Sequence, residues 1–169
     1  MYSSAVQAIS EPNRPIANLW LTIPCSWTSE VLVQLGYDTF TIDAQHGLAT
    51  DLSTLLPMLQ SMKGAKVLVR VPSLDVAYIG RMLDAGADGI ICPLINTAEE
   101  AAQLVAACRY PPMGLRSFGP LRVGMLAGNA YFESANSRVL VMAMIETAAG
   151  LENLEAIAQT PGLDGLYVG

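Results

Sequence analysis

The sequence predicts an α/β protein whose strands form a parallel sheet. Six short apolar segments recur along the 169 residues, and stretches with helical spacing separate them. The apolar segments are continuous runs rich in Val, Ile and Leu, whereas a strand with one face in water alternates polar and apolar residues. Continuous runs of this length indicate strands covered on both faces, which is typical of a parallel sheet flanked by helices.

The predicted strands are, in chain order, residues 18–24, 39–43, 66–72, 89–95, 138–146 and 165–169. Polar residues gather where several of them end, namely Gln45 and His46, Arg70, and Glu146. Barrels and open parallel sheets both place function at the carboxyl ends of their strands, so these side chains are the first candidates for a site.

Helices are predicted between the strands. Leucines repeat at helical spacing in residues 52–59, with Thr50 as the predicted N-cap. Residues 98–108 form a helix rich in Ala, Glu and Leu, capped by Thr97 and acidic in its first turn, where the helix dipole favours negative charge. Residues 151–158 repeat the pattern. The phrases LDAGADGI and TPGLDGLYVG each predict a helix end, a left-handed glycine and then a strand.

Right-handed crossovers between such elements give either an open doubly wound sheet or a (β/α)8 barrel. No Gly-x-Gly-x-x-Gly follows the first strand, which weakens the dinucleotide-binding version. A barrel has eight βα units and typically ~250 residues, whereas six strands are counted here. We therefore expect residues 1–169 to form a single domain, the N-terminal two-thirds of a barrel from a longer protein; alternatively, another chain covers the gap.

Composition excludes several classes of function. Hydrophobic residues make up 52% and charged residues 14%, which rules out disorder, and the net charge of −6 disfavours nucleic acid as a partner. The longest apolar run, 139–145, is far shorter than the ~20 residues that span a bilayer. Residues 1–15 have no signal-peptide pattern, and three cysteines without metal-type spacing indicate a reduced, cytoplasmic protein.

Four residues could carry chemistry. His46, the single histidine, is either a proton shuttle or a loop residue that bonds its neighbours. Asp43 either caps the turn after its strand or belongs to a hydration shell around a metal. Arg70, inside an apolar strand, needs an anion, which is either a protein carboxylate or a substrate. Glu146 needs a cation or a hydrogen-bond donor; carboxylates suit Mg²⁺ and Mn²⁺, but one is a weak metal signal.

The segment 109–138 holds four of the nine basic residues together with several glycines and prolines. It is either a mobile rim that attracts anionic substrates or a solvated surface loop. Surface or interface roles are expected for most of its arginines, with Arg116 and Arg122 as the exceptions.

The strings TIDAQHG, VLVRVP, RMLDAGADGIICPLINTAEEA, RYPPMGLRSFGPLR, AMIET and GLDGLYVG, in this order and spacing, resemble the HpcH/HpaI aldolase family. These are class II aldolases of 2-keto-3-deoxy and 4-hydroxy-2-oxo acids, such as 2,4-dihydroxyhept-2-ene-1,7-dioate aldolase. The resemblance covers nearly the whole chain from about Asn18 onward. It implies a (β/α)8 TIM barrel of the phosphoenolpyruvate/pyruvate superfamily, which is usually a homohexamer, and a divalent cofactor (Mg²⁺, Mn²⁺ or Co²⁺).

The resemblance also implies roles for individual residues. His46 matches the acid–base histidine and Asp84 the aspartate that orients it. Arg70 matches the arginine that holds the oxo acid, and Glu146 matches the first metal ligand. Gly169 falls on the glycine that opens a Gly-Pro-Ala-Asp loop, whose amides bind the pyruvate carboxylate and whose aspartate is the second metal ligand. The chain as given stops before that aspartate.

Two departures concern neighbouring residues: Met144 stands where relatives often have Gln, and Gln45 where many have Glu. The implied reaction is metal-dependent aldol cleavage of a 4-hydroxy-2-oxo acid to pyruvate and an aldehyde. The only lysines, Lys63 and Lys66, are predicted at the entry of the third strand, which disfavours a Schiff base. The alternatives are a citrate-lyase-β-like or malyl-CoA-type lyase, or a catalytically incomplete fragment.

Overall fold

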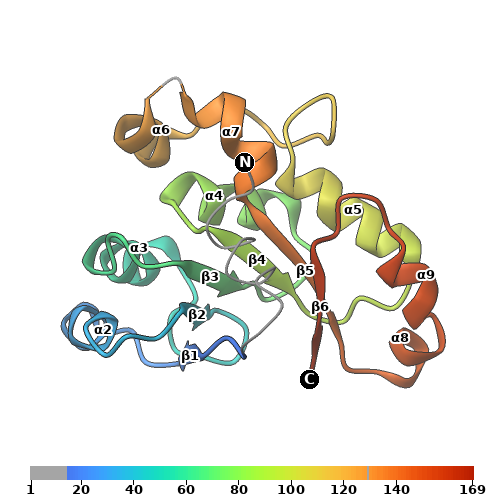
Figure 1. The fold of residues 1–169 in the computed structure, drawn as a ribbon, viewed down its shortest axis with the longest axis horizontal. Coiled ribbons are helices and arrows are strands. Elements are labelled where there is room, and N and C mark those ends of the chain that lie inside the picture. Colours follow the sequence, from blue (N-terminus) through green and yellow to red (C-terminus); the bar gives the residue numbers. More distant parts are fainter. Residues whose placement is uncertain (1–14, 129) are drawn as a thin grey trace.

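Six parallel strands form one curved sheet in the order of the chain, from β1 to β6 (Figure 1). The computed structural model describes residues 15–128 and 130–169. The prediction that residues 1–15 are not a signal peptide therefore concerns, apart from Pro15, residues outside the described part of the chain. Each observed strand falls within a predicted one, which confirms the predicted sheet. The strands are β1 (Asn18–Leu21), β2 (Thr39–Asp43), β3 (Val67–Arg70), β4 (Gly89–Cys92), β5 (Leu140–Ile145) and β6 (Gly165–Val168).

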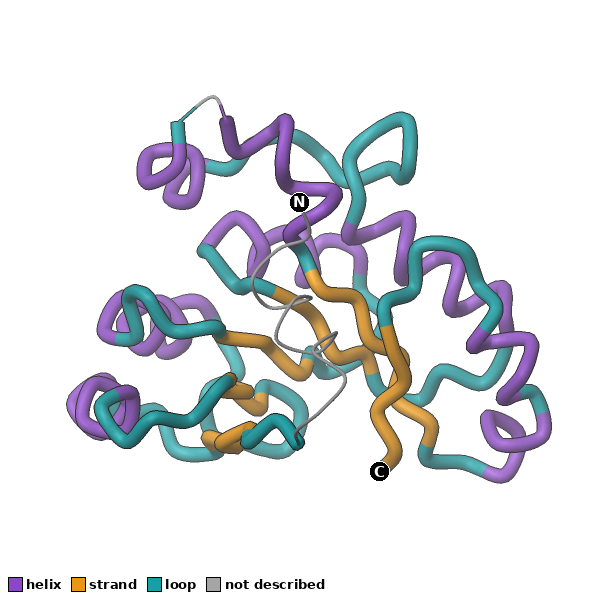
Figure 2. Tube along the Cα trace, in the orientation of Figure 1, coloured by secondary structure: helices purple, strands orange, loops and turns teal. Residues whose placement is uncertain are grey.

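Helices lie outside the curved sheet and at least one follows each of the first five strands (Figure 2). None of the helices among the described residues is long and apolar enough to span a membrane. The helices are α2 (Ser26–Val33), α3 (Leu52–Ser61), α4 (Val76–Ala85), α5 (Ala98–Cys108), α6 (Leu121–Ala127), α7 (Ala130–Arg138), α8 (Ala148–Glu152) and α9 (Leu154–Ala158).

The helix ends confirm some local predictions and correct others. Thr97 caps α5 in a capping box with Glu100, and α4 ends at the left-handed Gly86, with φ 104°, as predicted. The N-cap of α3 is Asp51 and not Thr50, because the Asp51 carboxylate accepts the amide of Thr54 at 3.1 Å. The helix predicted over 151–158 is two short helices, α8 and α9, which meet at Asn153.

The four central strands, β2 to β5, are buried almost throughout on both faces, whereas β1 and β6 are only partly buried. The outer face of the sheet packs fully buried residues such as Ile42, Val69 and Ile90 into the main core, which the helices complete. Its inner face carries a second, smaller cluster that includes Leu68, Ile91, Leu140 and Met144. Burial on both faces is the physical reason why the strands read as continuous apolar runs.

The sheet curls so far that its first and last strands face each other. The rings of Trp20 on β1 and Tyr167 on β6 lie 5.4 Å apart between their centroids. Within the described residues β1 pairs only with β2, and β6 only with β5. A doubly wound sheet reverses its strand order at a switch point, so the sequential order β1 to β6 identifies the barrel-type α/β architecture.

The segment 109–138 contains the helices α6 and α7, and many of its described residues are exposed, as expected of a surface segment; the alternative of a mobile rim stays a prediction. Arg109 is buried, donating to the carboxylate of Asp164 at 2.7 Å and to the carbonyls of Asn136 and Val139. Arg122 donates to carbonyls near the carboxyl ends of α3 and α4. These arginines are bound to partners distant in sequence, so the surface role expected for Arg109 is wrong.

Candidate active site at the carboxyl ends of the strands

A buried ion pair joins the last residues of two neighbouring strands. Asp43 ends β2 and Arg70 ends β3, and the two are register partners. Nε of Arg70 donates to Oδ1 of Asp43 at 2.9 Å, and Nη2 donates to Oδ2 at 2.5 Å. Asp43 is 1% exposed and Arg70 9%. Arg70 therefore has a protein carboxylate as its anion, in the bidentate geometry that only arginine can make.

Asp43 also fixes the loop that follows β2. Its Oδ1 accepts the backbone amides of Gln45 at 3.0 Å and His46 at 3.1 Å. Burial alone would raise the pKa of Asp43, but the hydrogen bonds from Arg70 and the two amides outweigh it and lower the pKa to about 2. The interpretation of Asp43 as the cap of this turn is confirmed, while a place in a metal's hydration shell stays a prediction.

The turn holds the exposed His46 at the rim of the sheet. The amide of Leu48 donates to the carbonyl of Thr22 at 2.8 Å, which ties the loop to the end of β1. Gly47 is required inside the turn, because a Cβ there would overlap the carbonyl oxygen of Asp43. The backbone beneath the histidine is thus held on both sides, and its side chain reaches solvent at the carboxyl ends of the strands.

One nitrogen of the Arg70 guanidinium is left without a strong acceptor. Nη1 faces the thioether sulfur of Met144 at 4.0 Å, and sulfur is a weak acceptor. The guanidinium carbon lies 4.9 Å from the centroid of the Trp20 ring, which covers the group from the first strand. Asp43, Trp20 and Met144 together fix the guanidinium while leaving the N–H groups of Nη1 available to an oxygen of a ligand.

Glu146 follows β5 at the same edge, and its side chain is exposed. Its Oε1 accepts the backbone amide of Leu94 at 2.9 Å, so the donor that the sequence required is present. Its Oε2 faces Gly169, where an added Cβ would lie 3.8 Å away. The amide of Gly169 itself donates to the carbonyl of Ile145 at 3.2 Å. That N–H is engaged within the sheet in this structure, and the substrate-binding role implied for Gly169 stays a prediction.

The described residues offer a divalent cation one carboxylate rather than a complete site. No group of three or more His, Cys, Asp or Glu side chains that could hold a metal ion gathers in residues 15–128 and 130–169. Glu146 nevertheless fits as a single ligand, because the bond from the Leu94 amide is made to Oε1 and hard divalent cations prefer carboxylate oxygens such as Oε2.

Asp84 does not lie at this edge. It is near the carboxyl end of α4, which runs back toward the amino ends of the strands because it connects the parallel strands β3 and β4. Its Oδ1 accepts Nη2 of the buried Arg116 at 2.6 Å. Within one chain Asp84 lies at the opposite end of the sheet from His46 and is paired with Arg116, so its role in orienting His46 stays a prediction. Arg116, in turn, is a buried structural residue.

The two lysines lie where the sequence predicted. Lys63 and Lys66 precede β3, at the amino ends of the strands, and Nζ of Lys66 is 3.9 Å from Oδ1 of Asp88. Neither is near Arg70 or Glu146, which end their strands at the opposite edge.

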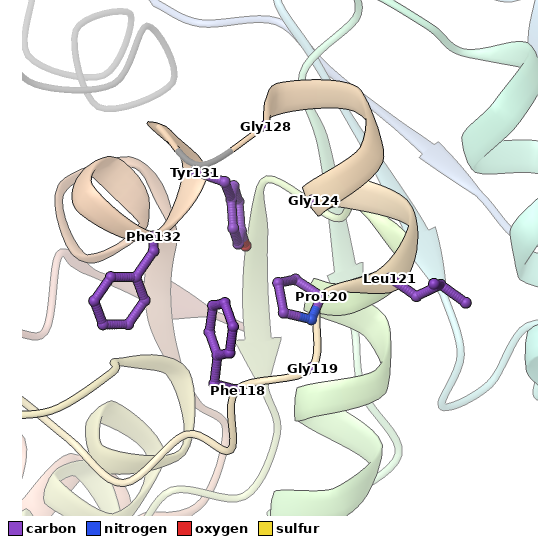
Figure 3. A pocket seen from close by; sticks show the side chains of 8 residues that line it. All are labelled: Phe118, Gly119, Pro120, Leu121, Gly124, Gly128, Tyr131 and Phe132. Carbon is purple, nitrogen blue, oxygen red and sulfur yellow. The ribbon is translucent and has the colours of Figure 1, made fainter.

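A hollow of about 660 Å³ lies away from this edge, between α6, α7 and the loop before them (Figure 3). Its lining has no charged side chain and consists of Phe118, Gly119, Pro120, Leu121, Gly124, Gly128, Tyr131 and Phe132. Tyr131 is its one residue with an ionisable side chain, and no carboxylate, histidine, cysteine or lysine lines it, so the candidate catalytic site remains at the carboxyl ends of the strands.

The fold and this edge define an α/β barrel protein that presents a fixed arginine, an exposed histidine and an exposed carboxylate at the catalytic end of its strands. The family model described as HpcH/HpaI aldolase/citrate lyase matches residues 18–169. The chain belongs to this family.

Relatives and solved structures agree with this assignment. The chain is 41% identical over 158 residues to hydroxypyruvate/pyruvate aldolase of Rhizorhabdus wittichii, covering 92% of this chain and 62% of the relative. It is 37% identical over 171 residues to 4-hydroxy-2-oxovalerate aldolase of Rhodococcus jostii, covering 99% and 66%. A crystal structure of an HpcH/HpaI aldolase/citrate lyase family protein from Burkholderia cenocepacia superposes with a TM-score of 0.91 at 32% identity, covering 99% and 68%.

Proposed function

We propose that this chain carries the catalytic edge of a carbon–carbon lyase, which cleaves a 4-hydroxy-2-oxo acid to pyruvate and an aldehyde in a metal-dependent aldol reaction. The observation that carries the proposal is the Arg70 guanidinium, held by Asp43 on the same edge as Glu146, with Nη1 facing only the weak sulfur acceptor of Met144. The names of the relatives, which are aldolases of oxo acids, support the same reaction class.

Arg70 binds the substrate in this proposal. Its Nη1 donates to an oxygen of the 2-oxo acid, and its charge lies beside the oxygen that becomes negative when the enolate forms. Donors that are already oriented stabilise such a charge without reorganising, which is where enzymes gain most. The bidentate bond to Asp43 and the ring of Trp20 supply that orientation.

His46 moves the proton. As base it accepts the proton of the C4 hydroxyl while the C3–C4 bond breaks and its electron pair moves to the C2 oxygen, which releases the aldehyde. The proton that His46 accepted is then delivered, directly or through a water molecule, to C3 of the enolate, which gives pyruvate and returns His46 to its starting state. The turn held by Asp43 and Gly47 positions the histidine backbone for this role.

Glu146 is proposed to hold the divalent cation, either Mg²⁺, Mn²⁺ or Co²⁺, through Oε2. A cation bound there would supply Lewis-acid polarisation of the oxo group. Leu94 keeps Oε1 engaged, so the carboxylate presents one oxygen in a fixed direction.

The experiment is an assay of pyruvate release from 4-hydroxy-2-oxo acids of different length. We expect release that requires Mn²⁺ or Mg²⁺ and is abolished by EDTA and by His46→Ala. Turnover only of a coenzyme A thioester would favour the citrate-lyase-β-like or malyl-CoA-type alternative, which the citrate lyase in the family description supports. A folded chain that binds no Mn²⁺ in calorimetry and releases no pyruvate would instead identify a catalytically incomplete fragment.

We extend the proposal to a cytoplasmic homo-oligomer, such as a hexamer. Three free cysteines support a reducing compartment. Large exposed apolar residues around α6 and α7, including Phe118, Leu121 and Phe132, support a surface that another subunit covers. Sedimentation equilibrium tests the oligomer directly, and a monomer at micromolar concentration would contradict it.

A further inference from the structure

The loop between β4 and α5 contains one unusual backbone conformation next to Glu146. Leu94 has φ 57°, and it is the one non-glycine residue with positive φ among the described residues. A left-handed conformation costs a leucine about 1–2 kcal/mol, so the surrounding contacts must impose it. In this conformation the Leu94 amide donates a hydrogen bond to Oε1 of Glu146 at 2.9 Å.

Asn96 imposes this conformation from two residues further on. Its Nδ2 donates to the carbonyl of Leu94 at 2.9 Å, and its Oδ1 accepts the hydroxyl of Thr147, the residue after Glu146. Its own carbonyl accepts Nδ2 of Asn153 at 2.8 Å. One side chain therefore links the loop that carries Leu94 to the segment that carries Glu146.

The two segments also touch directly. A Cβ on Gly150 would lie 2.9 Å from the carbonyl oxygen of Ile95, so only glycine allows this approach. The hydroxyl of Thr147 accepts the amide of Gly150 at 3.0 Å and thereby starts α8. The hydrogen bonds of Asn96 thus act across a tight junction and not across an open gap.

We propose that Asn96 is a positioning residue for the Glu146 carboxylate. By holding Leu94 in its left-handed conformation, Asn96 keeps the Leu94 amide on Oε1 and leaves Oε2 as the oxygen available to a cation. Glu146 is exposed, so without these hydrogen bonds its side chain rotates freely and loses orientation before a ligand binds. The part of the inference that concerns the cation rests on the proposed function. The hydrogen bonds from Asn96 to Leu94 and from Leu94 to Glu146, which we call the brace, are a property of the free protein.

The test compares Asn96→Ala with Asn136→Ala in the full chain. Asn136 is a matched control, because it is half-buried like Asn96 and its side-chain amide likewise makes two hydrogen bonds, both to the backbone of Tyr110. We titrate each variant with Mn²⁺ alone and follow hydrogen exchange of the Leu94 amide without metal. Outer ligand partners typically change metal affinity 10- to 100-fold, so we expect Asn96→Ala to weaken Mn²⁺ binding at least tenfold and Asn136→Ala to leave it within twofold.

The Leu94 amide distinguishes failure of the inference from failure of the proposed function. We expect its protection to fall at least tenfold in Asn96→Ala and in Glu146→Ala, which removes the acceptor oxygen, and to stay unchanged in Asn136→Ala. Unchanged protection in Asn96→Ala would overturn the inference whatever the metal does. If the wild type binds no Mn²⁺ while protection responds as expected, the metal assignment fails and the brace stands.

A second variant keeps the test decisive if Asn96→Ala does not fold. Leu94→Gly retains the amide and adopts positive φ without cost, so Mn²⁺ affinity and protection at position 94 should stay within about threefold of the wild type. A tenfold loss of either in Leu94→Gly would show that the leucine side chain, and not its braced amide, sets Glu146, which would contradict the proposal.

Discussion

Replacing Asp43 by Asn tests the ion pair on which the candidate site depends. The substitution keeps the shape of the side chain and the Oδ1 acceptor for Arg70 Nε and for the amides of Gln45 and His46. It removes the negative charge and places an NH₂ group against Nη2 of Arg70, where the carboxylate oxygen lay 2.5 Å away. Two donors then face each other inside a buried site.

The magnitude follows from the burial of both partners. Removing one member of a buried pair costs about 3–5 kcal/mol, because the other charge is left without compensation. Because the hydrogen bonds to Oδ1 survive, we expect Asp43→Asn to lower the free energy of unfolding by about 3 kcal/mol, the lower end of that range. With a urea m-value of about 2 kcal/mol/M, the midpoint of unfolding should fall by about 1.5 M. Asp51→Asn is the matched control: Asp51 is an exposed N-cap, and Asn caps a helix equally well, so its midpoint should not move.

The pH dependence gives the same test a direction. The pKa of Asp43 is about 2 in the folded chain, below the value near 3.9 of an unfolded aspartate, so its contribution is present above pH 4 and is lost as the pH falls toward 2. The stability difference between wild type and Asp43→Asn should therefore shrink over that range. Equal urea midpoints for Asp43→Asn and Asp51→Asn at pH 7 would refute the reasoning.

Substitutions at three further positions are predicted. Glu146→Gln should weaken Mn²⁺ binding at least tenfold in calorimetry while changing the free energy of unfolding by less than about 0.5 kcal/mol, because Glu146 is exposed; a large loss of stability would contradict this. Arg116→Met should lower the free energy of unfolding by about 2–3 kcal/mol, because it leaves Asp84 without its buried partner, and an unchanged urea midpoint would argue against the pair. Thr97→Ala should cost about 1 kcal/mol, and Thr97→Ser should restore most of it, as measured by thermal unfolding; a loss that Ser does not restore would exclude the capping box with Glu100 as its cause.

The strands and the edge that they define could be predicted from the sequence because both depend on local patterns. A strand covered on both faces is a continuous apolar run, and the polar residue that ends it marks the carboxyl edge. The pairing of Asp43 with Arg70 was within reach as well, since each ends a strand and parallel neighbours end together. The sequence does not state the register between β2 and β3, and that register decides that Asp43 lies opposite Arg70.

The rest depended on contacts between residues far apart in the chain. Arg116 reaches Asp84 across 32 positions, and Thr147 reaches Asn96 across 51. No local pattern encodes such partners, so the buried Arg109 was expected at the surface and α7, which is polar along most of its length, was not predicted. The N-cap of α3 failed for a different reason: Thr50 and Asp51 both suit a cap, and only the observed bond to Thr54 decides between them.

Charge counting at the carboxyl edge supports the proposed cation independently of any resemblance. Asp43 neutralises Arg70, so this pair offers a ligand oriented N–H donors but no net charge. Among the described residues, the other carboxylate that the site has at this edge is Glu146, and a 2-oxo acid would bring a second negative charge beside it. Two negative charges in one site repel each other unless something compensates them, and a divalent cation restores neutrality. A single carboxylate beside a neutralised arginine is therefore a coherent arrangement for an anionic substrate that arrives with a metal, and a poor one for an anion that binds alone.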